Sequence, residues 1–394
     1  MPRRFRVGVV GFGVAGAATA YLLARDGHRV TLIERAPAVE PIGAGILLQC
    51  SGQAVLRHLG VLDHVLAHAA PVEELHARHA DGGRTLIRTV YGEYAPGCRA
   101  YGVHRGVLFR ALRDLVYTQD VDVRLGRDVV SRTLTPFGEV LLTDDRGDAH
   151  GPFDCVVCGD GSRSHLRSVF GFSARVMGYD HGTLWVTAPA AVPNKLLQAV
   201  RGTRQMLGLL PLGDGLASLY WGIRNDELDA IRNRGLDALK AEMFAFCPEA
   251  APVLDFLQHF DQLIHTTYRH VHLRRAHDGR VIFIGDAAHA MSPHLGQGLN
   301  LALVDAWRLA EALRVAPAPA SAFARFSAAQ RDYLRYYSTV TWLLSPFFQS
   351  DWHLLGWGRN TFLPLMPLVP LVKRQMLMTV CGLKGGFVKG ELRV

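Results

Sequence analysis

The sequence is poor in cysteine, in charge of one sign and in long apolar runs, and each shortage excludes a class of protein. Six cysteines in 394 residues are too few for a disulfide-stapled scaffold and fit a reducing, cytoplasmic setting. No window of about 18 residues is apolar and free of charges and turn residues, as a membrane-spanning helix requires. No run of Lys and Arg exceeds two residues, so the net charge of +8 favours anionic ligands over nucleic acid.

Metal-ligand patterns are also missing. The 18 histidines are scattered, and the pairs His76/His79 and His289/His294 have no thiolate or carboxylate set beside them. Cys155–Cys158 has C-x-x-C spacing, but it lies in a predicted buried strand whose successive side chains point to opposite faces. We therefore expect no metal site.

The chain does have a large apolar fraction and a recognisable opening unit. Hydrophobic residues make up 49% of it, enough for a sizeable core, and its length suits about two or three folding units. Residues 5–10 form a short apolar run typical of a buried parallel strand. A glycine-rich turn, a helix over 17–25 and a second strand over 29–34 follow, which together predict a βαβ unit.

Gly11, Gly13 and Gly16 form a G-x-G-x-x-G pattern between that strand and that helix. Gly11 permits the tight turn, Gly13 lets backbone approach a pyrophosphate at the helix N-terminus, and Gly16 lets the helix pack closely on the strand. Glu34 ends the second strand, where its carboxylate can accept hydrogen bonds from an adenosine ribose. The unit predicts binding of FAD or NAD, because a carboxylate disfavours a 2′-phosphate.

Two further strand tips carry an acid next to glycine, and together they favour FAD. Asp160 follows the predicted strand over 153–158, and Asp286 follows the one over 281–284. A Gly-rich turn, Gly296–Asn300, then leads into a helix whose N–H groups can stabilise the negative charge of a reduced flavin. A nicotinamide needs no such second site far downstream.

Arginines near these tips are candidate phosphate contacts. Arg163 and Arg167 follow Asp160 at a spacing of one helical turn, so we expect them to face a phosphate together. Arg105 precedes a predicted helix over 107–116 and can reach the same pyrophosphate.

Taken together, these motifs resemble those of a known family. They occur in this order in the single-component FAD-dependent monooxygenases of the aromatic hydroxylase type, which include para-hydroxybenzoate, salicylate and ubiquinone-pathway hydroxylases. The resemblance covers residues 5–335. It is carried by the first motif with Glu34, by Gly159-Asp160-Gly161 with Arg167, and by Gly285-Asp286 followed by Pro293 and Gly296–Asn300.

The resemblance implies an α/β fold: a Rossmann-like FAD-binding domain (GR2-type) with an inserted β-sheet substrate domain and a C-terminal helical segment. We expect a discontinuous FAD-binding domain over residues 1–72, 98–180 and 268–335. The β-rich substrate domain would comprise residues 73–97 and 181–267, and the helical region residues 336–394.

Cofactor contacts are also implied. The ADP half of FAD would be held by Gly11, Gly13, Ala15, Gly16, Glu34, Arg35 and Arg105. Asp160 would serve FAD and the incoming NAD(P)H, and Asp286 would bind the ribityl or pyrophosphate part. The segment Gly43–Ile46, with Gly45, would pass beside the flavin and line the substrate pocket. The isoalloxazine ring would lie against Gly296, Gly298, Leu299 and Asn300.

The implied activity is hydroxylation of an aromatic small molecule, phenolic or quinone-like, with NAD(P)H and O2. NAD(P)H would reduce the flavin, O2 would add to give a C4a-hydroperoxyflavin, and the substrate would take its distal oxygen. The protein would supply orientation and a dry, apolar pocket, because water destroys the hydroperoxide. With no second G-x-G-x-x-G, the NAD(P)H site would be transient.

Four residues are candidates for contact with substrate or flavin. His289 lies one turn past Asp286, Pro293 lies in the flavin loop, and Tyr220 lies on the β-rich segment. Arg204 is a candidate anchor for a substrate carboxylate. Each has a structural alternative in capping, packing or strand formation, so no general base is assigned.

Three alternative functions fit parts of the pattern. An FAD-dependent reductase or dehydrogenase of a lipid-like or isoprenoid substrate would use the same cofactor without oxygen. A flavin halogenase is disfavoured, because Tyr220–Arg224 lacks the W-x-W-x-I-P pattern of that group. A flavin-binding scaffold without activity is the remaining alternative, and it predicts that NAD(P)H does not bleach the flavin.

The C-terminal region is helical and aromatic, and it makes a candidate contact for a membrane surface or a partner. Ala316–Ala320 has the composition of a linker. Thr361–Leu371 carries three prolines, which exclude one straight helix. The tail over 351–383, with Arg359, loosely resembles the ubiquinone-pathway branch. The patterns are compatible with a monomer or a homodimer.

Overall fold

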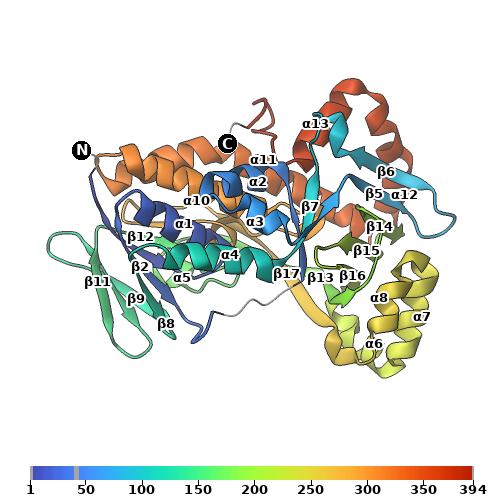
Figure 1. Cartoon of the computed structure of the whole chain (residues 1–394), viewed down its shortest axis with the longest axis horizontal. Coiled ribbons are helices and arrows are strands. Elements are labelled where there is room, and N and C mark those ends of the chain that lie inside the picture. The colour runs from blue at the N-terminus through green and yellow to red at the C-terminus, as the bar shows by residue number, and fades with distance from the viewer. Residues whose placement is uncertain (1–2, 40–43, 393–394) are drawn as a thin grey trace.

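The computed structural model describes residues 3–39 and 44–392, and a five-stranded parallel sheet forms the centre of its larger part (Figure 1). The strands follow the order β18-β12-β1-β2-β8, so strands far apart in the chain become neighbours. The apolar side chains of β1, β12 and β18 are buried on both faces, as expected of a parallel sheet, while those of the edge strand β8 are half-buried. Its strands are β1 (Arg6–Val10), β2 (Arg29–Glu34), β8 (Val121–Leu125), β12 (Cys155–Cys158) and β18 (Val281–Phe283).

Helices α1 and α10 contact each other beside this sheet, and both begin near the carboxyl ends of its strands. Helix α1 (Val14–Arg25) follows β1, and α10 (Gly298–Val315) follows the third acidic strand tip. The βαβ unit predicted for the N-terminus is therefore present. Around these helices lie α2 (Cys50–Leu59), α3 (Leu62–Leu66) and α4 (Arg105–Tyr117), whereas the short α5 (Leu166–Val169) packs in another cluster, beside β9 (Val129–Leu134).

Two small antiparallel sheets flank the parallel one. The first, β11-β10-β9, lies at the far left of Figure 1; it contains β9 (Val129–Leu134), β10 (Val140–Asp144) and β11 (Ala149–Phe153). The second has the order β3-β7-β4 and leads toward the other half of the molecule. It contains β3 (Gly45–Leu48), β4 (Ala69–Val72) and β7 (Ala100–His104).

The second half of the molecule is a mainly antiparallel sheet of seven strands in the order β17-β13-β16-β15-β14-β5-β6. One face packs on α6 (Leu228–Arg234), α7 (Leu236–Phe246) and α8 (Ala251–Phe256). The other face contributes to an apolar cluster with β3, β4 and β7. The strands are β5 (Glu74–His79), β6 (Thr85–Val90), β13 (Ala174–Pro189), β14 (Lys195–Arg201), β15 (Gln205–Pro211), β16 (Leu216–Arg224) and β17 (Ile264–Leu273).

Two strands of this sheet cross the sequence-based domain boundaries. Strand β13 begins at Ala174 and β17 ends at Leu273, and they pair over most of their length. Residues 174–180 and 268–273, expected in the FAD-binding domain, thus continue strands of the seven-stranded sheet. The boundaries themselves remain a prediction.

The C-terminal region is helical, as expected. Helix α11 (Pro319–Phe348) starts inside the predicted linker, which leaves only a short connection after α10. The proline-rich stretch is not one straight helix: α12 (His353–Phe362), the 3-10 helix η6 (Leu363–Leu368) and α13 (Pro370–Val380) follow one another. Within residues 3–39 and 44–392, no helix combines the length and apolarity needed to cross a membrane. Short elements complete the chain: η1 (Tyr91–Glu93), η2 (Asn225–Glu227), η3 (Pro248–Ala250), η4 (Phe260–Gln262), α9 (Asp286–His289) and η5 (Pro293–Leu295).

Candidate active site

The glycines of the first motif are required for two different reasons. Gly11 has φ +100°, and a Cβ there would lie 2.6 Å from the carbonyl oxygen of Gly159; a Cβ on Gly16 would lie 1.9 Å from the carbonyl oxygen of Gly11. These two positions therefore hold β1, β12 and α1 together. A Cβ on Gly13 would meet only one atom, at 3.9 Å. Gly13 caps α1 without a side-chain hydrogen bond, so the helix start is left open for a ligand.

Glu34 is held in place at the end of β2. Its carboxylate accepts hydrogen bonds from the backbone N–H of Phe12 at 2.6 Å and of Ala36 at 2.9 Å. Glu34 and the exposed Arg35 both line a cavity of about 220 Å³. Because each carboxylate oxygen can accept two hydrogen bonds, Glu34 keeps capacity for the hydroxyls of a ribose.

The middle motif lines the same cavity. Asp160 follows β12, and neither of its buried carboxylate oxygens has a hydrogen-bond partner among the described residues. Burial raises the pKa of Asp160 above its usual range, while Ser164 acts in the opposite direction. Such a group is unfavourable unless a ligand satisfies it. The cavity is lined by Gly11, Gly13, Glu34 and Arg35 from the first motif and by Gly159, Asp160, Gly161 and Arg163 from the second.

The expected phosphate-binding arginines do not act together. Arg163 is exposed and lines the cavity. Arg167 is buried, and its guanidinium donates hydrogen bonds to the carbonyl oxygens of Ala287 and Ser162, each at 2.9 Å. The expectation that both arginines face one phosphate is wrong, since Arg167 instead joins the middle motif to α9. Arg105 is an exposed residue that opens α4, outside the lining of this cavity.

The third strand tip packs directly on the first. Gly285 has φ +57°, and a Cβ there would lie 3.0 Å from the Cβ of Ala15 in α1. Asp286 is exposed at the start of α9, and its Oδ1 would lie 3.7 Å from a Cβ on Gly298 at the start of α10. The three motifs therefore converge at one edge of the parallel sheet, as their positions at strand ends predict.

The loop before α10 is joined to β3. Gly296, with φ +60°, packs beside Leu47. The Asn300 side chain accepts a hydrogen bond from the N–H of Gln49 at 2.9 Å and donates to the carbonyl oxygens of Leu47 and Gly296. Asn300 thus fixes the loop against the strand that would run beside the flavin, and Leu299 is half-buried next to it.

Gly45 lies where the two halves of the molecule meet. A Cβ at this position would lie 2.8 Å from both Ser218, in β16 of the seven-stranded sheet, and Leu212, which follows β15. The Gly45 N–H donates a hydrogen bond of 3.4 Å to the Ser218 hydroxyl. The remaining glycine expected beside the flavin, Gly43, lies outside the described residues.

His289 is a buried residue that bonds to an acid. Its Nε2 lies 2.5 Å from Oδ2 of Asp305, which also accepts from the backbone N–H of Gly285. Burial lowers the pKa of His289, but the charge of Asp305 and its hydrogen bond outweigh burial and raise that pKa above its usual value. Gln330 donates to the other carboxylate oxygen at 2.6 Å. The geometry supports a positioning role for His289; Pro293 is exposed in η5.

Sequence reasoning did not single out Asp305 or Gln330. Asp305 lies in a stretch of α10 whose neighbours are buried and apolar, and it is itself 0% exposed. A lone acid in such a stretch is a signal that it has a buried partner. Its partner, His289, could not be identified without the fold.

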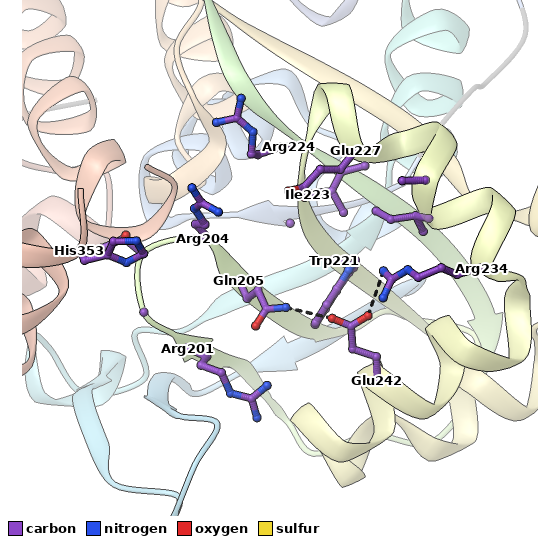
Figure 2. A pocket seen from close by; sticks show the side chains of 15 residues that line it. Arg201, Arg204, Gln205, Trp221, Ile223, Arg224, Glu227, Arg234, Glu242 and His353 are labelled. Atoms are coloured by element: carbon purple, nitrogen blue, oxygen red, sulfur yellow. Dashed lines mark hydrogen bonds and ion pairs between the residues drawn. The ribbon is translucent and has the colours of Figure 1, made fainter. Parts of the chain in front are cut away.

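Tyr220 and Arg204 contribute to different sites of the seven-stranded sheet, because Tyr220 lies in β16 and Arg204 lies in the turn between β14 and β15. Tyr220 belongs to the apolar cluster with Leu47 and Leu212, and its hydroxyl accepts a hydrogen bond of 2.5 Å from Gln198. Its neighbour Trp221 points the other way and, with Arg204, lines a cavity of about 540 Å³ under α6 and α7 (Figure 2).

The arginines of this second cavity already have acidic partners. Arg204 pairs with Asp351 at 2.6 Å, and Figure 2 shows Glu242 contacting both Gln205 and Arg234. Arg201 pairs with Asp81 and Arg224 with Asp226. The geometry therefore gives no support to Arg204 as the anchor of a substrate carboxylate.

Comparisons with known proteins identify relatives of this chain. Residues 4–319 match the family of the FAD binding domain. The chain is 30% identical over 318 residues to a probable 2-heptyl-3-hydroxy-4(1H)-quinolone synthase of Rhodococcus erythropolis, covering 77% of this chain and 78% of the relative. It is 33% identical over 313 residues to 6-methylpretetramide 4-monooxygenase of Streptomyces rimosus, covering 76% and 72%.

Solved structures share the fold. PqsL of Pseudomonas aeruginosa, in complex with 2-aminobenzoylacetate, superposes with a TM-score of 0.80 at 23% identity, covering 90% of this chain and 99% of PqsL. An FAD complex of Klebsiella pneumoniae HpxO gives a TM-score of 0.81 at 19% identity, covering 96% and 99%. The mixed α/β architecture, with its parallel Rossmann-like sheet and antiparallel second sheet, is that of this group, as predicted. The chain belongs to the FAD-binding monooxygenase family, and the protein is an FAD-dependent monooxygenase.

Proposed function

We propose that the protein hydroxylates an apolar aromatic small molecule, phenolic or quinone-like, with NAD(P)H as the reductant and O2 as the oxidant. The substrate would lie between β3 and the inner face of the seven-stranded sheet. The observation that carries this proposal is the convergence of three glycine–acid strand tips at one edge of a sheet, next to an apolar contact between the two halves. FAD, when bound, supplies hydride acceptance from NAD(P)H and activation of O2.

The chain's own groups fit the parts of FAD. The open N-terminus of α1 at Gly13 suits a pyrophosphate, and Glu34 suits the adenosine ribose. The orphaned carboxylate of Asp160 gains partners if polar groups of FAD or of NAD(P)H reach it. Asp286, exposed beside the start of α10, suits a ribityl hydroxyl, and the N-terminus of α10 can stabilise negative charge on the reduced ring.

Residues at the contact between the two halves exclude water. Leu47, Leu210 and Leu212 are all at most 8% exposed and belong to one cluster. The rings of Trp185 and Tyr220 lie 5.1 Å apart beside them. Burial raises the pKa of Tyr220 well above its usual range, so its hydroxyl stays protonated and can donate a hydrogen bond to a substrate oxygen.

The named relatives support an aromatic substrate. A quinolone synthase and a pretetramide monooxygenase are among them, and PqsL was solved with 2-aminobenzoylacetate. The apolar side chains at the contact between the two halves favour a substrate with few polar groups.

Substrate-stimulated oxygen uptake tests the proposal. The FAD-loaded protein would be mixed with NADPH or NADH and a panel of phenols, quinolones and quinones. Oxygen uptake would be recorded, and the masses of the products would be measured by mass spectrometry. The proposal requires oxygen uptake and a product heavier by one oxygen atom. Oxidation of NAD(P)H coupled to substrate reduction without oxygen uptake would instead support the dehydrogenase alternative.

We also propose that the surface of α12, η6 and the start of α13, which we name the C-terminal face, rests on an anionic lipid bilayer. Large apolar side chains on it are strongly exposed, Leu354 by 86%, Leu368 by 73% and Trp357 by 69%, as is Trp352, the N-cap residue of α12, by 72%. Surface apolar groups gathered in this way mark a contact site, and tryptophan favours the lipid–water interface.

Charge on the C-terminal face selects the lipid. Residues 352–380 contain no Asp or Glu, and of their three Arg and Lys residues Arg359 is only 3% exposed and faces the interior. Arg374 is exposed and Lys373 is half-buried beside Glu93. A face with apolar side chains and cations at its rim binds anionic membranes more tightly than neutral ones.

Co-sedimentation with phosphatidylglycerol and phosphatidylcholine vesicles tests this contact. We expect binding to the anionic vesicles, loss of binding in Leu354→Asp, and full binding in Phe137→Asp. Phe137 is the matched control because it is also 86% exposed but lies in the β9–β10 turn. The membrane contact is overturned if the parent protein co-sediments with neither kind of vesicle. That outcome overturns it even if Leu354→Asp disrupts a dimer, since the exposed side chains would then serve an interface between two copies of the chain.

A further inference from the structure

Three cysteines that are distant in the sequence meet at one point. Cys50 is the first residue of α2, Cys98 precedes β7, and Cys381 follows α13. The sulfur of Cys98 lies 2.9 Å from that of Cys50 and 3.8 Å from that of Cys381, and all three lie within 4.8 Å of one another. Three of the six cysteines of the chain thus share one site.

This arrangement suits a bound metal ion better than a disulfide bond. A disulfide would join two of the sulfurs and leave the third without a function. Three thiolates around zinc, with Zn–S bonds of about 2.3 Å, have sulfurs roughly 3.8 Å apart in tetrahedral geometry. The separation of Cys98 and Cys381 already has this value, and a small side-chain shift of Cys50 completes the triangle.

Unpartnered buried oxygen donors lie beside the sulfurs. Gln49 precedes Cys50 and is 0% exposed, and neither of its amide atoms has a hydrogen-bond partner among the described residues. The hydroxyl of Tyr91, also 0% exposed, lies within reach of the Gln49 side chain, but the two groups do not form a hydrogen bond of good geometry. Tyr91 belongs to one apolar cluster with Cys381, against which Cys50 and Cys98 pack. Buried polar atoms of this kind indicate a missing ligand.

We propose that Cys50, Cys98 and Cys381 bind one thiophilic metal ion, with an oxygen donor in the fourth position. Thiolates select soft or borderline ions such as Zn²⁺ and Cu⁺. On binding, three S–H bonds break, three metal–sulfur bonds form and three protons pass to solvent, while the oxidation state of the ion does not change. Cys50 and Cys98 are half-buried, which gives the ion a path into the site.

The metal would tie the C-terminal segment to the flavin loop. The carbonyl oxygen of Cys381 accepts a hydrogen bond of 3.2 Å from the N–H of Ser51. Gln297, in the loop before α10, donates to the carbonyl oxygen of Val380 at 2.8 Å. An ion that joins α2, the segment before β7 and the residue after α13 would therefore hold residues 379–382 against the loop that carries the third motif.

Zinc retention by the metal-free, FAD-loaded full chain tests the site. After incubation with Zn²⁺ and desalting, we expect one zinc per chain, release of protons on binding, and protection of three thiols from a thiol reagent. Cys98→Ser should lose the zinc and keep its FAD. Cys247→Ser is the control, because Cys247 is also a free thiol, although a fully buried one, and it belongs to the cluster under α6 and α7.

Cobalt gives an independent readout. Tetrahedral Co²⁺ bound to thiolates has d–d bands at longer wavelengths than flavin absorption, so they can be seen in the loaded protein. Equal zinc retention by the parent and Cys98→Ser proteins would overturn the proposal, as would loss of two thiols to a disulfide with no zinc bound. Neither result depends on whether the protein hydroxylates any substrate.

Discussion

Nε2 of His289 lies 2.5 Å from Oδ2 of Asp305, and the same carboxylate oxygen accepts the backbone N–H of Gly285. One buried acid therefore fixes both the strand tip that begins the third motif and the helix that follows it. Gln330 of α11 donates to the second oxygen, so the C-terminal helix is linked to the same point. The relationship explains why His289 is buried although it follows an exposed Asp286.

This pair should make stability depend on pH. The folded-state pKa of His289 is raised. The pair therefore adds its full contribution to the free energy of unfolding below the unfolded-state pKa of His289. That contribution is lost as pH rises through the folded-state pKa. Asp305→Asn should lower the free energy of unfolding by about 3–5 kcal/mol at low pH and flatten its pH dependence. Urea unfolding of the FAD-free protein across pH measures both effects. Asp122→Asn, which removes an exposed carboxylate paired with Arg124, should cost only about 0–1 kcal/mol.

Gly13→Val should separate folding from cofactor binding. The space around a Cβ at Gly13 is open except for one atom at 3.9 Å, so the variant should fold, with a loss of about 1 kcal/mol from a poorer helix cap. The valine side chain would occupy the place of the pyrophosphate, and the purified protein should be colourless. Gly92→Val is the control, because a Cβ there also meets nothing within 4 Å. A yellow Gly13→Val protein would contradict the assigned nucleotide site.

Asp160→Asn should have opposite effects on stability and on FAD. The folded-state pKa of Asp160 is raised by burial, so the FAD-free protein loses stability as pH rises from the unfolded-state pKa through the folded-state pKa. Removing the charge should stabilise the FAD-free protein at neutral pH by on the order of 1 kcal/mol. Thermal melts with and without FAD check this: the melting temperature should rise without FAD, and the shift that added FAD produces should shrink.

The sequence was sufficient wherever function depends on local backbone geometry. Gly11, Gly13 and Gly16 stand between a strand and a helix, and only that context gives their spacing a meaning. Asp160 and Asp286 follow short apolar runs, and the carboxyl ends of parallel strands must share an edge. The convergence of the three motifs could therefore be predicted from the sequence.

Contacts that depend on side-chain direction or on distant packing could not be predicted. Arg167 has the spacing of a phosphate ligand, yet its guanidinium turns inward to Ala287. Arg204 and Tyr220 both come from the β-rich segment, but Arg204 lies in the turn between β14 and β15 and lines the cavity under α6 and α7, away from the cluster that contains Tyr220. The meeting of Cys50, Cys98 and Cys381 joins three segments that no local pattern relates.

Tyr220→Phe and Arg204→Ala should act differently because Tyr220 belongs to the apolar cluster between the two halves, whereas Arg204 lines the separate cavity under α6 and α7. Tyr220→Phe removes a buried hydroxyl that accepts from Gln198, at a stability cost of about 1 kcal/mol. If that hydroxyl contacts substrate, kcat/KM should fall about tenfold, which corresponds to roughly 1.4 kcal/mol, while FAD retention is unchanged.

Arg204→Ala breaks an exposed ion pair with Asp351 and should leave kcat/KM within about twofold. Steady-state oxygen uptake with the identified substrate measures both, and a larger loss in Arg204→Ala than in Tyr220→Phe would place the substrate in the cavity of Figure 2 instead.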